Sequence, residues 1–144
     1  MDASALILHV EDDPIDVGNL RRALALCGAV NPVRAATNGA EAWDLLHGSG
    51  GGRPLRPGII LLDLSMPVQG GLEFLRQLKS EPALRSIPVV VLSASRHDRD
   101  LRAAYELGAA GYVVKPIDFD GFVRAIATVE RYWALSEIPA GAAR

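Results

Sequence analysis

Acidic, hydroxyl and basic side chains stand directly after four of the chain's short apolar runs. In chain order, these groups are Glu11-Asp12-Asp13, Asp63, Ser93-Ala94 and Lys115-Pro116. If the apolar runs are parallel strands of one sheet, their carboxyl ends meet at one edge, where open α/β sheets bind ligands. The sequence therefore predicts that carboxylates, one hydroxyl and one lysine converge at a single site.

The carboxylates of this predicted site favour a magnesium ion. Clustered carboxylates repel one another unless a proton or a cation lies between them. Oxygen ligands with no His or Cys nearby are those that Mg²⁺ prefers in proteins. We expect Asp12 and Asp63 to bind the ion directly. Glu11 can contribute through water, and the backbone carbonyl of Ser65 is expected within reach of the same ion.

Beside such an ion, Asp63 is suited to act as a nucleophile toward phosphorus. Lys115 can neutralise one phosphoryl oxygen, and Ser93 can donate a hydrogen bond to another. A metal ion and a lysine together stabilise the charge of the transferring group, which is most of what phosphoryl transfer requires. Asp63, Ser93 and Lys115 are therefore the candidate catalytic residues, and the product would be an acyl phosphate on Asp63.

The elements that must hold these groups alternate between strand and helix patterns. Apolar runs predict strands at residues 6–10, 33–36, 59–62, 89–92 and 112–114. Apolar residues at helical spacing predict helices near residues 17–27, 38–47, 72–78, 101–105 and 119–133. Strands that alternate with helices pair in parallel through right-handed crossovers. The predicted fold is α/β: a doubly wound, five-stranded parallel sheet with five helices and the flavodoxin-like order 2-1-3-4-5.

Length and composition exclude several classes of protein. The chain has 144 residues, with 15 Lys plus Arg and 17 Asp plus Glu, so its net charge is −2. We expect one domain over residues 1–144, with a core of about 5–135 and a short tail at 136–144. The net charge shows no excess of basic residues for binding nucleic acid. No apolar run approaches the roughly 20 residues that span a bilayer. The single Cys27 suits a reducing compartment. We therefore expect a cytoplasmic protein that binds neither nucleic acid nor membrane.

These motifs, in this order, resemble the receiver domain of bacterial response regulators over about residues 5–135. The matching pieces are Val10-Glu11-Asp12-Asp13, Leu62-Asp63-Leu64-Ser65-Met66-Pro67, Gly71, Ser93-Ala94 and Gly111-Tyr112-Val113-Val114-Lys115-Pro116. Each piece alone is weak, but five in the right order, each at the right strand end, are highly specific.

The resemblance implies a role in two-component signalling. A sensor histidine kinase would supply the phosphoryl group to Asp63 with Mg²⁺, and the chain would catalyse its own phosphorylation and dephosphorylation without acting on an external substrate. Ser93 and Tyr112 would be the switch residues, which alter the face formed by the fourth helix, the fifth strand and the fifth helix. The resemblance also implies a cis peptide bond before Pro116.

A narrower similarity concerns the second half of the chain. Its segments are Ser95-Arg96-His97-Asp98-Arg99-Asp100-Leu101, Ala104-Tyr105 and Glu130-Arg131-Tyr132-Trp133. They are similar to single-domain regulators, without an output domain, that pair with phytochrome-type kinases. This similarity implies a bacteriophytochrome as the partner kinase and a homodimer through the switching face. Tyr105, Tyr112 and Trp133 are apolar candidates for the dimer surface, although Trp133 suits core closure equally well.

Two other functions stay open on the sequence. The first is a receiver fold kept as a phosphorylation-independent interaction module, which the intact set of Asp12, Asp63, Ser93 and Lys115 disfavours. The second is a phosphatase with an aspartate nucleophile. Such an enzyme needs a second acid two residues after the nucleophile, where this chain has Ser65.

Overall fold

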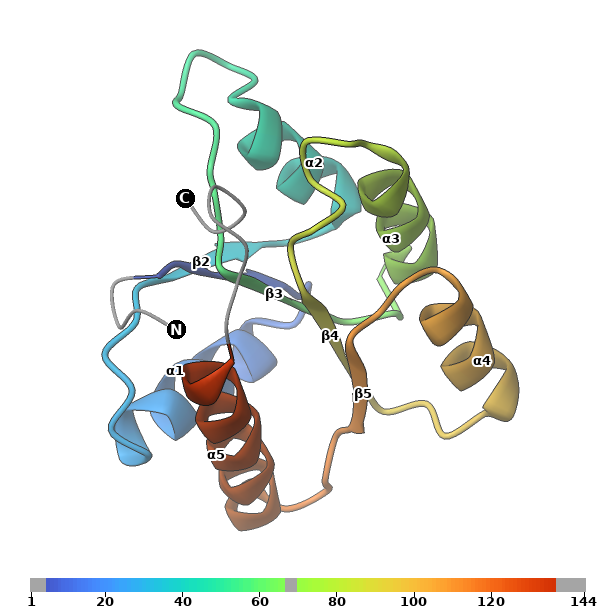
Figure 1. Cartoon of the computed structure of the whole chain (residues 1–144). Coiled ribbons are helices and arrows are strands. Elements are labelled where there is room, and N and C mark those ends of the chain that lie inside the picture. Colours follow the sequence, from blue (N-terminus) through green and yellow to red (C-terminus); the bar gives the residue numbers. More distant parts are fainter. Residues whose placement is uncertain (1–4, 67–69, 137–144) are drawn as a thin grey trace.

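Five parallel strands form the centre of the computed structural model, which describes residues 5–66 and 70–136 (Figure 1). The strands are β1 (Ile7–Val10), β2 (Val33–Ala36), β3 (Ile59–Leu62), β4 (Val89–Ser93) and β5 (Gly111–Val114). Their order is β2-β1-β3-β4-β5, and every neighbouring pair is parallel. The predicted fold class and strand order are confirmed. Pro67 and residues 137–144 of the predicted tail lie outside the described residues.

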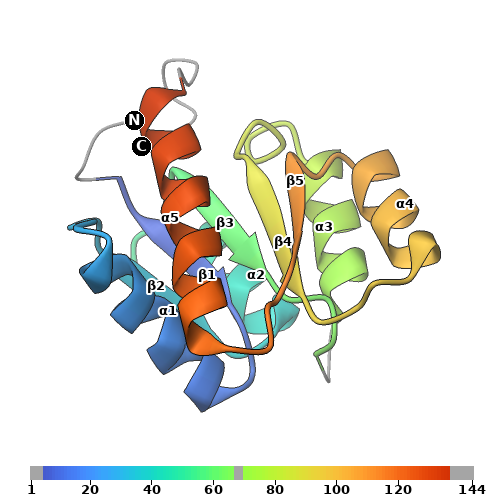
Figure 2. The ribbon, with the colours of Figure 1, turned by 90° about the horizontal axis from the view of Figure 1, so that it is seen from below.

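Five helices cover the two faces of this sheet. They are α1 (Pro14–Leu26), α2 (Gly39–His47), α3 (Gly71–Ser80), α4 (Asp98–Glu106) and α5 (Phe119–Leu135). Helices α1 and α5 pack together on one face, and α2, α3 and α4 lie on the other (Figures 1 and 2). None of the helices in the described ranges has the length and apolar character needed to cross a bilayer.

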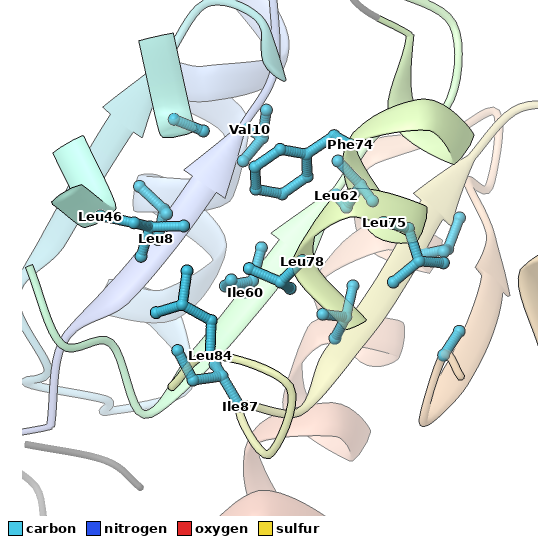
Figure 3. Packing of buried hydrophobic residues seen from close by; sticks show 14 of the residues in the cluster. Leu8, Val10, Leu46, Ile60, Leu62, Phe74, Leu75, Leu78, Leu84 and Ile87 are labelled. Atoms are coloured by element: carbon cyan, nitrogen blue, oxygen red, sulfur yellow. The ribbon is translucent and has the colours of Figure 1, made fainter. Parts of the chain in front are cut away.

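The central strand β3 is apolar at every position because helices cover both faces of the sheet. Along β1, Leu8 and Val10 point toward α2 and α3, whereas Ile7 packs with the α1 and α5 side. Figure 3 shows the layer of side chains between the sheet and α2 and α3, in which Phe74 of α3 packs against the sheet. The edge strand β2 is more exposed, as its short and charged sequence predicts. Two aliphatic layers therefore fix the strands, and with them the residues that follow each strand.

Local capping fixes where the helices begin. The Asp13 carboxylate accepts a hydrogen bond of 2.9 Å from the backbone N–H of Ile15, and Pro14 occupies the first helical position of α1. Asp118 accepts a hydrogen bond of the same length from the N–H of Gly121 at the start of α5. Aspartate is among the residues preferred at an N-cap, and proline is common at the first helical position. Helices α1 and α5 are thereby started next to the carboxyl edge of the sheet.

The peptide bond before Pro116 differs from the prediction. The described residues contain no cis peptide bond, so the Lys115–Pro116 bond is trans and the expectation of a cis bond is wrong. An X–Pro bond favours trans by only about 0.5–1 kcal/mol, so local contacts decide the isomer and the dipeptide alone does not.

Candidate functional site

The acidic residues of the site stand where β1 and β3 end. The N–H of Glu11 donates to the carbonyl of Ala36 at 2.8 Å, and the N–H of Asp63 donates to the carbonyl of Val10 at 3.0 Å. These bonds continue the sheet's ladder by one residue beyond each strand. The backbones that carry the carboxylates are therefore as fixed as the sheet itself.

Glu11, Asp12 and Asp63 form the group of acids in the described chain that could hold a metal ion. One carboxylate oxygen from each lies within 4.8 Å of the others. Glu11 and Asp63 are buried, while Asp12 is exposed and leaves the group open to solvent. Hard oxygen donors with one open side suit Mg²⁺, which retains several of its waters. The donor set thus fits the predicted ion.

Lys115 lies against this acidic group. Its Nζ atom is 2.6 Å from Oε1 of Glu11, 3.0 Å from Oδ2 of Asp16 and 4.0 Å from Oδ1 of Asp63. The backbone is held as well, because the N–H of Lys115 donates to the carbonyl of Ser93 at 2.8 Å. Residues from both ends of the chain therefore meet, and the lysine brings a positive charge beside the candidate nucleophile.

The remaining predicted residues lie around this centre. Ser93 is fully buried at the end of β4, and its hydroxyl oxygen accepts a 3.2 Å hydrogen bond from the N–H of Ser95. No hydrogen bond joins Ser93 to Asp63 among the described residues. Ser65 is exposed, and its backbone N–H hydrogen-bonds Asp63. The use of the Ser65 carbonyl as a metal ligand stays a prediction.

The electrostatics of the site reflect an excess of buried negative charge. Burial raises the pKa of Glu11 to about 7, although the hydrogen bond and the charge of Lys115 oppose this change. Burial also raises the pKa of Asp63, and the charge of Lys115 again acts in the opposite direction. Burial alone would lower the pKa of Lys115, but its bonds to Glu11 and Asp16 outweigh burial and raise it. A divalent cation would relieve this excess, which supports the fit of the acidic group to Mg²⁺.

Asp16 is part of the site, and the sequence analysis did not single it out. A periodicity signal was present. Asp16 lies four residues before Leu20 and eight before Leu24, both of which are buried. Residues at these spacings share one face of a helix. An acid that continues an apolar stripe into the first turn of α1 is thereby directed toward the sheet edge and Lys115.

Two of the three aromatic candidates for a dimer surface are accessible. Tyr105 is 50% exposed, and Tyr112 is half-buried with its hydroxyl donating to the carbonyl of Ser95 at 3.0 Å. Trp133 is 5% exposed and packs in the layer of α1 and α5. The prediction that Trp133 lies on the dimer surface is therefore wrong, because α5 turns this ring toward the sheet. The alternative prediction, that Trp133 closes the core, is confirmed.

Comparison with known proteins identifies the class of protein that this site belongs to. The family model of the response regulator receiver domain matches residues 7–127. The chain therefore belongs to the response regulator receiver domain family.

Two curated relatives match most of the chain. The probable methanogenesis regulatory protein FilR2 of Methanothrix harundinacea is 39% identical over 129 residues, which are 89% of this chain and 83% of FilR2. Response regulator Rcp1 of Synechocystis is 32% identical over 129 residues, which are 89% of this chain and 88% of Rcp1.

Three solved structures are similar in fold and in sequence. Phosphorylated RcpA, a cyanobacterial phytochrome response regulator, has a TM-score of 0.86 and 31% identity over 94% of this chain and 99% of its own. The Mn²⁺-bound form of Rcp1 has a TM-score of 0.87 and 31% identity over the same shares. The bacteriophytochrome response regulator RtBRR has a TM-score of 0.75 and 43% identity over 96% of this chain and 86% of its own. This chain is thus close to phytochrome response regulators.

Proposed function

We propose that this chain is a phosphoacceptor switch, in which Asp63 receives a phosphoryl group from the phosphohistidine of a sensor kinase. The observation that carries the proposal is the placement of Asp63. Its carboxylate lies in one group with Glu11 and Asp12, and its Oδ1 atom is 4.0 Å from the ammonium of Lys115. A nucleophile between a cation site and a lysine is what phosphoryl transfer requires.

In the transfer, a carboxylate oxygen of Asp63 forms a bond to phosphorus while the bond between phosphorus and the kinase imidazole nitrogen breaks. The imidazole nitrogen keeps the electron pair of that bond, and Asp63 becomes an acyl phosphate. Lys115 donates a hydrogen bond to a phosphoryl oxygen, and Ser93, at the end of the neighbouring strand β4, donates another. Hydrolysis of the acyl phosphate returns Asp63 to its carboxylate. The chain is modified and regenerated and converts no external substrate, so we class it as a regulator.

Glu11, Asp12, Asp63 and the carbonyl of Ser65 would hold Mg²⁺, which when bound neutralises charge on the phosphoryl oxygens. The support is the acidic group itself, together with the Mn²⁺-bound form of the relative Rcp1. The phosphorylated form of the similar protein RcpA supports the phosphoacceptor role in the same way.

The signal would leave the site through Ser93 and Tyr112, the proposed switch residues. Ser93 is bonded to the N–H of Ser95, and Tyr112 to the carbonyl of the same residue. Rotation of Ser93 toward a phosphoryl group breaks the first bond and so changes the loop that Tyr112 holds. Two arrangements of α4, β5 and α5 would then differ in their affinity for a partner. The exposed Tyr105 on α4 suits a second copy of this chain as one such partner.

The proposed kinase is a bacteriophytochrome, because RcpA and RtBRR are phytochrome response regulators. Purified bacteriophytochrome kinase is expected to transfer phosphate to this chain faster than a sensor kinase without a photoreceptor. Equal transfer from both kinases would contradict this pairing.

The phosphoacceptor role is tested with Mg²⁺ and acetyl phosphate, and the product is read by intact mass. We expect a single phosphoryl adduct on the wild-type chain and none on Asp63→Asn. The matched control is Asp44→Asn, an aspartate in α2 outside the acidic group. An adduct on Asp63→Asn, or none on the wild type with either acetyl phosphate or the kinase, would reject the role.

A further inference from the structure

Lys115 has two carboxylate partners within hydrogen-bond distance, and one of them is outside the acidic group. Oε1 of Glu11 lies 2.6 Å from its Nζ atom, and Oδ2 of Asp16 lies 3.0 Å away. We infer that Asp16 is a positioning residue of the phosphoacceptor site. Its carboxylate holds the Lys115 ammonium so that the remaining N–H donates a hydrogen bond to a phosphoryl group on Asp63. This inference rests on the proposed function.

The donor count of the ammonium group supports this role. A lysine ammonium has three N–H donors. Glu11 and Asp16 accept two of them, and one remains. Oδ1 of Asp63 is 4.0 Å from Nζ, which is too long for a direct hydrogen bond but puts an oxygen of a phosphoryl group on Asp63 within reach of the remaining N–H. The two anchors therefore set both the distance and the direction of the donor that remains.

Asp16 is the anchor that a bound cation leaves undisturbed. Glu11 belongs to the acidic group with Asp12 and Asp63, so a cation there draws on the same carboxylate that binds Lys115. Asp16 lies outside that group. When the cation binds, Asp16 keeps its full charge for the lysine and limits the movement of the ammonium.

Both ends of this contact are fixed by the fold. Asp16 lies in the first turn of α1, which the Asp13 cap begins and whose Leu20 and Leu24 are buried. Lys115 is fixed by its own backbone bond to Ser93. The contact joins the start of α1 to the end of β5. The side chain of Asp16 is 36% exposed and that of Lys115 is 16% exposed. Asp16 is therefore accessible enough to be replaced without unfolding the chain.

The first test observes Lys115 directly, in the metal-free protein. The chain has two lysines, so ¹⁵N-labelled lysine gives two ammonium signals, and Lys79 is an internal reference because its Nζ donates to two backbone carbonyls at 2.7 and 2.8 Å. Asp16→Asn is expected to speed proton exchange at the Lys115 ammonium at least about threefold, and to leave Lys79 unchanged. Asp120→Asn is the matched control, because it removes an acid from the first turn of α5, where Lys115 has no ion pair. Equal exchange rates in all three proteins would overturn the inference.

The second test measures the rate of adduct formation with acetyl phosphate and saturating Mg²⁺. Asp16→Asn is expected to slow it about tenfold, the change that one charge-assisted hydrogen bond represents. Asp16→Glu should restore most of the rate, and Asp120→Asn should have no effect. In a Lys115→Met background, Asp16→Asn should cause no further loss, because it acts through the lysine. Equal urea midpoints for wild type and Asp16→Asn would separate this effect from a loss of stability.

The outcomes distinguish this inference from the function on which it rests. A wild-type chain that forms no adduct with either acetyl phosphate or the kinase overturns both. A wild-type chain that forms the adduct, with Asp16→Asn as fast or faster, overturns only the positioning role. A faster variant would mean that Asp16 withholds Lys115 from the phosphoryl group.

Discussion

Replacing Gly71 with alanine is expected to destabilise the protein by about 2 kcal/mol. The same change at Gly70, the N-cap of α3, should cost less than about 1 kcal/mol, because only the weaker capping preference of alanine is involved. A Cβ atom on Gly71 would lie 2.6 Å from Cα of Leu64 and 3.1 Å from the carbonyl carbon of Asp63, and closer still to that residue's carbonyl oxygen. Among the residues that the structure describes, a Cβ atom on Gly70 would meet only the carbonyl oxygen of Leu64, at an ordinary 3.9 Å. Two adjacent glycines thus offer a matched pair.

The magnitude follows from what obstructs the new methyl group. Overpacking in a core costs about 1–3 kcal/mol, and we take the upper end because the crowded atoms are backbone. That backbone is held by the bond from Asp63 to Val10 at 3.0 Å and by the bond from Gly71 to Leu64 at 3.2 Å. Alanine regains about 0.5–1 kcal/mol over glycine through the lower entropy of the unfolded chain. The net loss of about 2 kcal/mol lowers the Tm by about 4–8 °C for a chain of this length.

Urea unfolding followed by circular dichroism measures both variants against the wild type. The midpoint of Gly71→Ala should fall with an unchanged slope. Gly70→Ala should stay within about 1 kcal/mol of the wild type, the cost of a weaker N-cap. Because two of the three crowded atoms belong to the backbone of Asp63, Gly71→Ala should also form the phosphoryl adduct more slowly. Equal midpoints for the two variants, or a larger loss at Gly70, would refute the packing argument.

Three further predictions concern charge and the cation. Between pH 7 and pH 4.5 the wild type should lose about 2–3 kcal/mol more unfolding free energy than His9→Leu. Burial lowers the pKa of folded His9 to about 3, whereas a histidine in the unfolded chain takes up a proton below about 6.5. This contribution is present above pH 6.5 and is lost as the pH falls; parallel urea-unfolding profiles in the two proteins would contradict it. Lys115→Met should slow adduct formation about 100-fold by intact mass, since a charge-stabilising donor is lost, and wild-type rates would exclude that role. EDTA should abolish adduct formation, while Mg²⁺ at ten times its Kd should stabilise the fold by about 1.4 kcal/mol in thermal unfolding; an adduct formed in EDTA would argue against the cation.

The fold could be predicted because pattern and topology determine it together. Runs such as Ile59–Leu62 are apolar throughout, and only strands with helices on both faces bury them. The alternation of strands and helices then limits the order of the sheet. Element limits were less certain: α4 begins at Asp98, before the first apolar residue of its stripe at Leu101, because helices begin in polar turns.

The candidate site was predictable at the strand ends and less so elsewhere. Glu11, Asp63 and Lys115 follow strands directly, so their meeting depends only on the sheet order. Asp16 depends on how α1 is rotated about its axis, which becomes certain only when the helix packs. The isomer before Pro116 depends on a small energy difference, and no pattern in one sequence reports it.

The residues of the site are far apart in the sequence. The bond between Glu11 and Lys115 joins residues that are 104 positions apart, and it exists only when β5 has paired with β4 at the edge of the sheet. A nascent or partly folded chain carries Asp63 without its lysine. Under the proposed function, such a chain would be a poor phosphoryl acceptor, so the kinase would signal only through fully folded molecules. Incompletely folded chains would then be excluded from signalling without a separate mechanism, because the chain becomes able to accept the phosphoryl group only when the sheet is complete.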